Sequence, residues 1–167
     1  LAQWISNFLV TLTFPILLVG AGFAFASKKD GRNQKTYVII SEGEMYEGSV
    51  WETALFAAQN QLDNLILILD RNRNIILGDT EDLVQLNPID SKWEAFGWST
   101  YETDGHDLKT LVNLLTNVPD SSGKPIAIVA HTVKGKGVSF MENNMVWHSK
   151  AMSDNEYENA IKELKDI

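Results

Sequence analysis

The chain has 167 residues, a formal net charge of −8 and a hydrophobic content of 44%. This length fits one domain with a hydrophobic core, and the negative charge argues against nucleic-acid binding, which needs a basic face. Because the sequence has no cysteine, disulfides and thiolate metal sites are excluded, and any metal must be bound by oxygen or imidazole ligands. The absence of cysteine also fits the reducing cytoplasm, which we predict as the location.

An apolar run extends from Trp4 to Ala26, and four basic residues follow it closely. A run of this length with a positive flank resembles a membrane-spanning helix. Pro15 interrupts the run, however, and several polar residues dilute its first half. A buried helix of a globular domain is therefore preferred, and we do not expect a membrane protein. Residues 1–14 are left as an unassigned apolar segment ahead of one domain over residues 15–167.

Predicted helices and strands alternate through that domain. In chain order, hydrophobic periodicity predicts helix 16–27, a buried strand 37–40, helix 49–61, strand 65–69, a long loop 72–87, helix 90–96, strand 98–102, helix 108–117, strand 125–130 and helix 155–165. The first helix contains small residues that suit close packing, namely Gly20, Ala21, Gly22, Ala24 and Ala26. Asp90 and Asp107 are the predicted N-caps of their helices. This order is typical of an α/β fold with an open, mostly parallel sheet and helices on both faces. Ligands of such sheets bind beyond the carboxyl ends of the strands.

Acidic residues and glycines follow the first predicted strand. Residues 41–44 read Ser-Glu-Gly-Glu, and Glu47 and Gly48 precede the next helix. Gly43 would let the backbone approach a ligand closely, and a helix N-terminus favours phosphate. Acids beside a phosphate indicate a bound Mg²⁺ or Ca²⁺, since both ions take carboxylate and phosphate oxygens. An acidic loop that favours the helix dipole explains the same residues, and this loop alone does not exclude that interpretation.

Asn72 stands just after the second predicted strand, as Glu42 stands after the first. The carboxyl ends of neighbouring parallel strands lie at one edge of a sheet, so the carboxylate and the amide could converge on Mg²⁺ and a diphosphate. Asparagine is also common in turns for purely structural reasons. Among the histidines, His106 is assigned to a structural turn, and His131 is interpreted as a core histidine without a functional role.

Several blocks of the sequence resemble transketolase, and in particular the amino-terminal subunits of split transketolases. They include SEGEMYEGSVWETALFAAQNQLDNLILILDRN, LGDTEDL, KWEAFGW, DGHDLKTL and HTVKGKGVSFMENNMVWHSK, in the family's order. Thiamine-diphosphate enzymes carry a Gly-Asp-Gly motif, which is followed by an asparagine one helix and one strand later. The resemblance covers the chain from about Pro15 onward. It implies a thiamine-diphosphate-binding fold that is incomplete at its N-terminus.

The resemblance also implies roles for individual residues. Glu42 stands where the family has its metal-binding aspartate, Gly43 matches the glycine against the diphosphate, and Asn72 matches an asparagine that binds both metal and diphosphate. Asn74 falls where a backbone carbonyl completes the shell of Mg²⁺ (or Ca²⁺). These positions imply thiamine diphosphate and a divalent metal as cofactors.

Two further positions concern catalysis and assembly. His148 matches a histidine near the cofactor phosphate and the substrate, which makes it the candidate catalytic residue of this chain. Glu47 matches an acid linked to the partner subunit's cofactor site. The family's catalytic glutamate belongs to a separate pyrimidine-binding domain. The resemblance therefore implies a pyrimidine-binding (carboxy-terminal) partner subunit, sugar phosphate substrates, and a dimer or heterotetramer.

Two departures from the family pattern bear on function. Ser41-Glu42-Gly43 replaces Gly-Asp-Gly, and glutamate is one methylene longer than aspartate, whereas Mg²⁺ needs near-ideal octahedral geometry. Residues 7–14 stand in place of a glycine-rich loop of the family and do not resemble it. The leading hypothesis is a transketolase-like transferase that transfers a two-carbon ketol unit between sugar phosphates. The alternatives are a truncated or degenerate binding module and a related enzyme that acts on another ketose.

Overall fold

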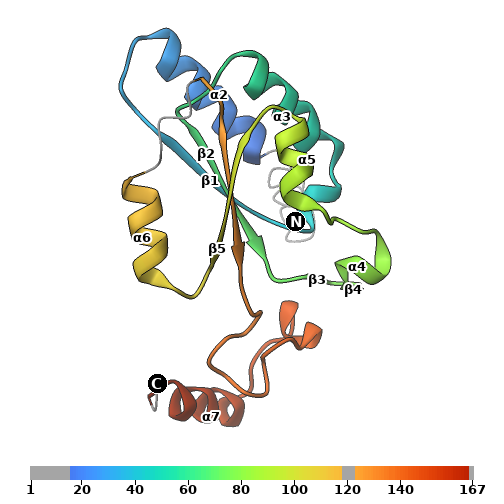
Figure 1. Cartoon of the computed structure of the whole chain (residues 1–167). Coiled ribbons are helices and arrows are strands. Elements are labelled where there is room, and N and C mark those ends of the chain that lie inside the picture. The colour runs from blue at the N-terminus through green and yellow to red at the C-terminus, as the bar shows by residue number, and fades with distance from the viewer. Residues whose placement is uncertain (1–15, 118–122, 166–167) are drawn as a thin grey trace, which may run out of the picture.

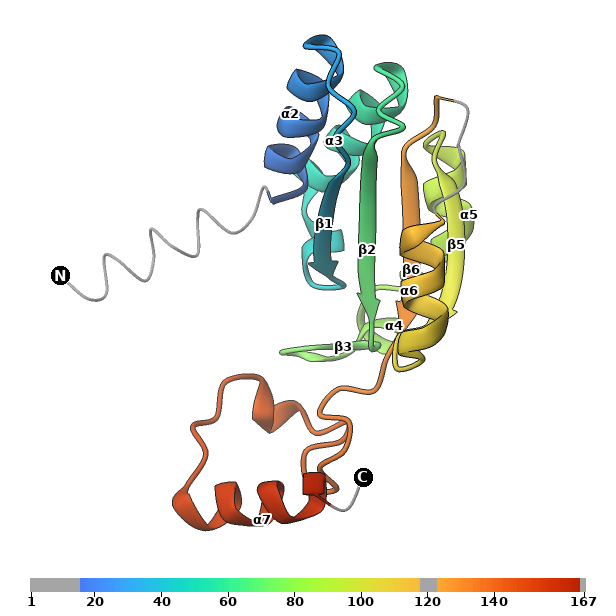
Figure 2. The same ribbon diagram turned by 90° about the vertical axis from the view of Figure 1, so that its left-hand side faces the viewer.

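A four-stranded parallel sheet forms the centre of the protein. The computed structural model describes residues 16–117 and 123–165. The strands are β1 (Thr36–Ser41), β2 (Leu65–Arg71), β5 (Ser99–Asp104) and β6 (Ile126–His131), and they lie in the order β1-β2-β6-β5. Every neighbouring pair is parallel. All four strands therefore end at one edge, which faces downward in Figures 1 and 2. The predicted open parallel sheet is confirmed.

Helices cover both faces of this sheet, as predicted. Helices α2 (Ile16–Lys29), α3 (Gly48–Gln59) and α5 (Ile89–Ala95) lie on one face, and α6 (Leu108–Thr116) lies on the other (Figure 1). The last segment contains the short 3-10 helix η2 (Met145–His148) and helix α7 (Asp154–Lys165). Figure 2 places this segment beyond the carboxyl edge of the strands. Part of the C-terminal chain is thus positioned next to the edge where ligands of such sheets bind.

The larger core lies between the sheet and the three-helix face. Trp93 and Trp98 are almost fully buried, with their rings 4.9 Å apart, and the Trp98 indole donates a hydrogen bond of 3.0 Å to the Ala54 carbonyl oxygen. Helix α2 approaches β1 so closely that a Cβ at Gly20 would clash with the Val38 side chain. Of the small residues of this helix, Gly20, Ala21 and Ala24 are buried and pack closely as predicted, whereas Gly22 and Ala26 are exposed.

The structure corrects three predictions. The first strand was expected to be buried, but Tyr37 and Ile39 of β1 are exposed because α6 packs on β2, β5 and β6 instead. Asp90 does not cap α5: Pro88 is at the N-cap and Asp90 lies in the first turn, whereas Asp107 caps α6 as predicted. The loop 72–87 contains the strands β3 (Asn74–Ile75) and β4 (Gly78–Asp79) and the helix α4 (Thr80–Leu83).

In the described part of the chain no helix is both long enough and apolar enough to cross a membrane. Residues 1–14 lie outside the described residues, so their assignment and the domain boundary at residue 15 stay predictions.

Replacing Trp98 by alanine tests the importance of the aromatic core. The change removes a buried indole and its hydrogen bond, and we expect the free energy of unfolding to fall by about 3–5 kcal/mol. Phe23 is 68% exposed, so Phe23→Ala serves as the control, with an expected change within about 0.5 kcal/mol. Urea unfolding followed by circular dichroism measures both. Equal losses in the two variants would contradict this account of the core.

Candidate functional site

The strand register brings the predicted site residues to one edge of the sheet. Ser41, the last residue of β1, pairs with Asp70 of β2, and Arg71 pairs with His131 of β6. Glu42 and Asn72 therefore leave the sheet on neighbouring strands at its carboxyl edge, as the sequence predicts. The same register sets Glu42 beside Arg71, a residue to which the motifs gave no role.

Glu42 and Arg71 form a buried ion pair. Nη1 of Arg71 donates to Oε1 of Glu42. The side chain of Arg71 is 2% exposed, and that of Glu42 is 0% exposed. The second oxygen of Glu42, Oε2, is buried and has no hydrogen-bond partner among the described residues. Burial raises the pKa of the Glu42 carboxyl above its usual value, although the Arg71 guanidinium opposes the shift. The carboxylate thus depends on Arg71 for its charge compensation.

Arg71 also binds the segment that follows β4. Its guanidinium donates to Thr80 Oγ1 at 3.0 Å, to Glu81 Oε1 at 2.8 Å and to Asn87 Oδ1 at 3.1 Å. Burial alone would lower the pKa of Arg71, but its carboxylate partners outweigh burial and hold the pKa above its usual value. For Glu81, burial would raise the pKa, but the bonds from Arg71 and from backbone N–H groups lower it. One guanidinium therefore joins the β1 loop to residues 80–87.

Asn72 and Asn74 bond mainly to each other. The backbone N–H of Asn74 donates to Asn72 Oδ1 at 3.0 Å, and Asn74 Nδ2 donates to the Asn72 carbonyl oxygen at 2.7 Å. Asn72 Nδ2 donates to Asp70 at 3.2 Å, and Asp70 also accepts from the hydroxyl of Thr132. These bonds hold the Asn72 amide in a fixed orientation at the end of β2.

A cavity of about 370 Å³ opens at this edge. It is lined by Arg71, Asn72, Arg73, Asn74, Asp79, His131, Thr132 and Asn143, and so by residues from β2, β3, β6 and the C-terminal segment. The side chain of Arg73 is 57% exposed, with Asp79 at 3.6 Å. An exposed guanidinium and several amide groups suit a phosphate-containing ligand. Glu42 does not line this cavity, since its side chain is turned into the protein.

The residues predicted to bind a metal do not fit a divalent cation as they are arranged. Oε1 of Glu42 is bonded to Arg71, Oε2 is enclosed, and Asn72 Oδ1 accepts from Asn74. Mg²⁺ needs several oxygens pointed at one centre, and a buried guanidinium beside the carboxylate would repel it. Within residues 16–117 and 123–165, no cluster of three or more His, Cys, Asp or Glu side chains could hold a metal. The metal site stays a prediction, and these contacts argue against it.

The other predicted residues lie at exposed or partly exposed positions. Gly43 is exposed in ordinary right-handed backbone geometry, and an added Cβ would lie 3.7 Å from Ile75, so only close approach of a ligand would require glycine there. Glu47 is the N-cap residue of α3, but its side chain accepts no capping hydrogen bond from the backbone of that helix. His148 is exposed on η2, and no hydrogen bond joins it to the sheet edge in the described part of the chain.

The remaining histidines have structural contacts. Nε2 of His106 accepts a hydrogen bond of 2.7 Å from the backbone N–H of Val133, which agrees with the predicted turn role. His131 was interpreted as a core residue, and this is wrong: its side chain is 51% exposed and lies 3.0 Å from Glu102. The β6 strand ends there, so His131 emerges from the core into solvent.

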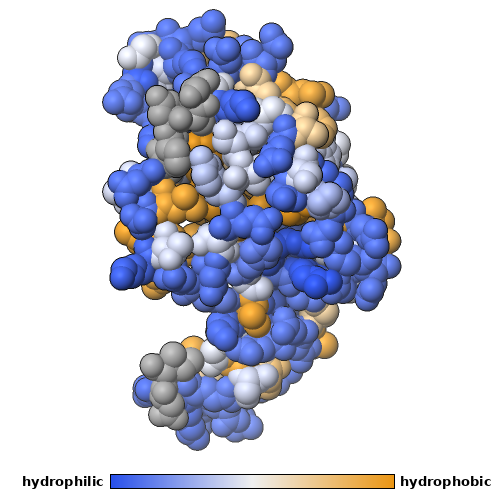
Figure 3. Space-filling view, in the orientation of Figure 1, coloured by the Kyte–Doolittle hydropathy of each residue, from blue (hydrophilic) through white to orange (hydrophobic). Residues whose placement is uncertain are grey.

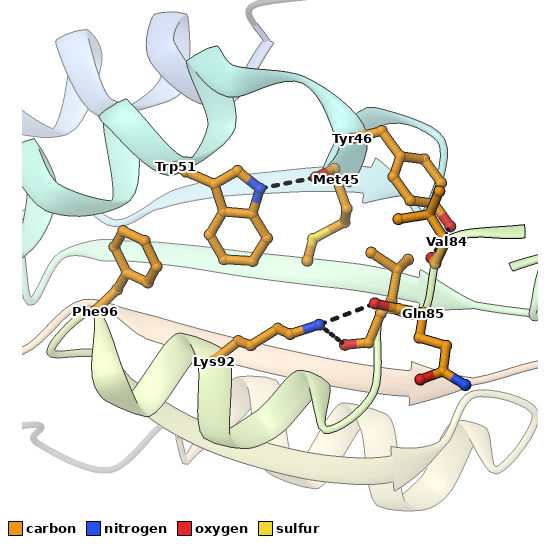
Figure 4. Close-up of a pocket in the computed structure, with 8 residues that line it drawn as sticks. Met45, Tyr46, Trp51, Val84, Gln85, Lys92 and Phe96 are labelled. Carbon is orange, nitrogen blue, oxygen red and sulfur yellow. Dashed lines mark hydrogen bonds between the residues drawn. The ribbon is translucent and has the colours of Figure 1, made fainter. Parts of the chain in front are cut away.

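A second cavity, mainly apolar and of about 430 Å³, lies between α3 and α5. Figure 4 shows the side chains of Met45 and Trp51 turned toward it from one side, with Lys92 and Phe96 on the other side at α5. The Lys92 ammonium donates to the carbonyl oxygens of Gln85 and Leu86, and so it fixes residues 84–87 rather than facing the cavity as a free charge. This cavity adjoins the same segment that Arg71 binds.

Replacing Arg71 by leucine should destabilise the fold strongly. The change leaves the Glu42 carboxylate buried without a partner, and we expect the free energy of unfolding to fall by about 3–5 kcal/mol. The double variant Glu42→Leu/Arg71→Met removes both charges and should lose less. Arg32→Leu, which breaks an exposed ion pair, is the control. A loss in Arg71→Leu no larger than about 1 kcal/mol, typical of exposed pairs, would contradict the buried-pair account. Urea unfolding gives each value.

Comparison with known proteins agrees with this fold. The model of the family "Transketolase, thiamine diphosphate binding domain" matches residues 5–165. The chain is 45% identical to one subunit of the apulose-4-phosphate transketolase of Actinobacillus succinogenes, over 90% of this chain and 54% of that protein. It is 37% identical to a 6-deoxy-6-sulfo-D-fructose transketolase subunit of a Clostridium species, over 86% of this chain and 52% of that protein.

Solved structures give the same result. The transketolase of Campylobacter jejuni superimposes with a TM-score of 0.81 at 28% identity, over 87% of this chain and 24% of that one. The chain thus spans about half the length of these subunit relatives and about a quarter of that transketolase. Because the family model matches nearly the whole chain, this protein belongs to the transketolase family through its thiamine-diphosphate-binding domain.

Proposed function

We propose that this domain binds the diphosphate end of thiamine diphosphate in an enzyme that transfers a two-carbon ketol unit between sugar phosphates. One observation carries the proposal: the Gly43 loop and Asn72 emerge from neighbouring strands at the carboxyl edge, where a cavity of about 370 Å³ opens. Ligands of parallel α/β sheets bind at this edge. The family membership makes thiamine diphosphate the ligand to test first.

Each predicted residue has a proposed task in that enzyme. Asn72, already oriented by Asp70 and Asn74, would donate to the diphosphate, and Gly43 would allow its close approach. The exposed Arg73 guanidinium would balance the negative charge. When bound, the thiazolium ring of the cofactor supplies the carbon chemistry, whereas this chain binds and orients it.

The proposed task of His148 concerns the substrate. An exposed imidazole on η2, in the segment beyond the sheet edge, would reach a sugar phosphate that enters from that side (Figure 2). It would donate a hydrogen bond to substrate or cofactor phosphate and so position the reacting groups. His148→Ala should therefore reduce the rate of ketol transfer more than it reduces cofactor affinity.

We propose that a pyrimidine-binding partner subunit completes the active site, in a dimer or heterotetramer. Two relatives are named as single subunits of a transketolase, which supports a partner, and so does the surface of this chain. Large apolar side chains are exposed on α3 and around β3–β4–α4, namely Leu55, Phe56, Ile76, Leu77 and Val84. Figure 3 shows apolar patches on an otherwise hydrophilic face. Exposed apolar groups of this size favour a protein contact. A cytoplasmic location stays a prediction.

A second candidate is a non-catalytic binding or assembly module. The buried Glu42–Arg71 pair favours it, because the motif acid is occupied by a residue of the chain itself. A third candidate acts on another ketose; the names of two relatives, an apulose-4-phosphate and a 6-deoxy-6-sulfo-D-fructose transketolase subunit, illustrate the range. Cofactor binding separates the second candidate from the first, and substrate profiling separates the third.

Calorimetric titration with thiamine diphosphate tests the proposal, first with the chain alone and then with a pyrimidine-domain subunit. We expect saturable binding that becomes tighter with the partner. Asn72→Ala should weaken it by about tenfold or more, since a hydrogen bond to a charged group contributes about 1.5–3 kcal/mol. Asn113→Ala, on the exposed side of α6, should leave the affinity unchanged. A folded chain that binds no cofactor with or without the partner would refute the proposal and favour the assembly module.

A further inference from the structure

The carboxylate that the motif assigns to a metal already has a cation beside it. Glu42 is 1% exposed, and its Oε1 accepts from a guanidinium that is itself buried. A buried carboxylate needs a positive partner, whether that is a side chain or a metal ion. Here the side chain of Arg71 meets that need.

The position of Arg71 is fixed from several directions, so it is not free to leave. Thr80, Glu81 and Asn87 accept further hydrogen bonds from its Nη1 and Nη2 groups. A divalent ion at Glu42 would have to displace the guanidinium from Glu42 and leave that charge with Glu81 alone. It would also have to reach Oε2, which is enclosed and faces no described cavity.

The side chains of Glu42 and Arg71 are complementary in geometry. Glutamate is one methylene longer than aspartate, and the parallel register places residue 42 next to residue 71 across β1 and β2. The longer side chain reaches across to the guanidinium of the neighbouring strand. A shorter aspartate would leave a gap at this contact, and an apolar residue 71 would leave the glutamate uncompensated.

We propose that the Arg71 guanidinium takes the place of the divalent cation at Glu42, so that Glu42 is not a metal ligand in this protein. The same guanidinium then keeps residues 80–87 attached to the β1 loop without a metal. This inference rests on the proposed function only for the location of the cofactor site. It concerns the metal alone, and metal binding is measured without cofactor or turnover.

The experiment compares metal binding in four forms of the full chain. These are the unmodified chain, Glu42→Asp/Arg71→Leu, Arg71→Leu alone and the control Arg32→Leu, which removes an exposed arginine of the Arg32–Asp30 pair. A fifth form, Glu42→Gln, is measured to show whether any ion bound by the unmodified chain is bound by Glu42. Mn²⁺ serves as a paramagnetic probe, and free Mn²⁺ is counted by electron paramagnetic resonance. Thermal unfolding with Mg²⁺ or with EDTA gives a second readout, because an ion that binds only the folded state raises the midpoint.

We expect the unmodified chain and Arg32→Leu to bind no Mn²⁺ at Glu42 and to unfold at the same temperature in Mg²⁺ and EDTA. The double variant restores the motif aspartate and removes the competing charge, so its Mn²⁺ affinity should rise by about 10-fold to 100-fold, the usual effect of changing the groups around a metal ligand. Its unfolding midpoint should rise with Mg²⁺. If the variants that lack Arg71 do not fold, the comparison of the unmodified chain with Glu42→Gln still tests whether Glu42 binds a metal ion.

Two results would overturn the proposal. One is Mn²⁺ binding by the unmodified chain that Glu42→Gln abolishes, since Glu42 would then be a ligand despite Arg71. The other is absence of binding in a folded double variant, since Arg71 would then not be what excludes the ion. Failure to bind thiamine diphosphate would refute the proposed function separately and would leave these metal readouts interpretable.

Discussion

The buried contact between Glu42 and Arg71 organises the whole carboxyl edge of the sheet. The Glu42 carboxylate could not remain charged inside the protein without Arg71, because an isolated buried ion costs several kcal/mol, whereas Arg71 has Glu81 as a second acidic partner. Arg71 is at the end of β2, and its further bonds reach α4 and the residue before Pro88. The guanidinium therefore fixes two points of the chain between β4 and α5, and Lys92 and Tyr46 hold the residues between them. The cavities on either side of that path depend on it as well.

This arrangement links packing to function. The apolar cavity between α3 and α5 is bounded by residues 84–86, which Lys92 holds by their carbonyl oxygens. The polar cavity at the sheet edge is bounded by Arg71 to Asn74. Arg71 lines the polar cavity and also binds the segment that borders the apolar cavity. A substitution at residue 71 should therefore change the shape of both cavities. A partner subunit that packed on the exposed Ile76, Leu77 and Val84 would contact the chain between β3 and α5, which includes the residues that Arg71 binds.

Most of the fold follows from hydrophobic patterning, and the departures have physical causes. Strands β2 and β6 are recognisable because they are continuous buried apolar runs, as in residues 65–69, whereas β5 reads Ser-Thr-Tyr-Glu-Thr-Asp and is only partly buried. The β1 strand has the same kind of run, but its exposed Ile39 depends on how far α6 extends across the sheet, and no local pattern encodes that. Asp107 caps a helix as predicted, whereas Asp90 does not, since Pro88 begins α5 earlier. The short strands β3 and β4 pair only two residues each and lack a detectable period.

The site illustrates what motif spacing predicts and what it leaves out. Spacing places Glu42 and Asn72 at one edge, and the register agrees. Spacing does not predict the direction in which a side chain points. Arg71 and Asn72 are neighbours in sequence and both border the polar cavity, but the Arg71 guanidinium is buried against Glu42, whereas the Asn72 amide bonds to Asp70 and Asn74. A basic residue in that inward position is the signal that motif spacing misses. A lone arginine at the end of an apolar strand needs a buried acid, and the neighbouring strand supplies one only at residue 42. The acid of the motif and the arginine beside the motif asparagine are thus best understood as one pair rather than as a metal ligand with an unrelated neighbour.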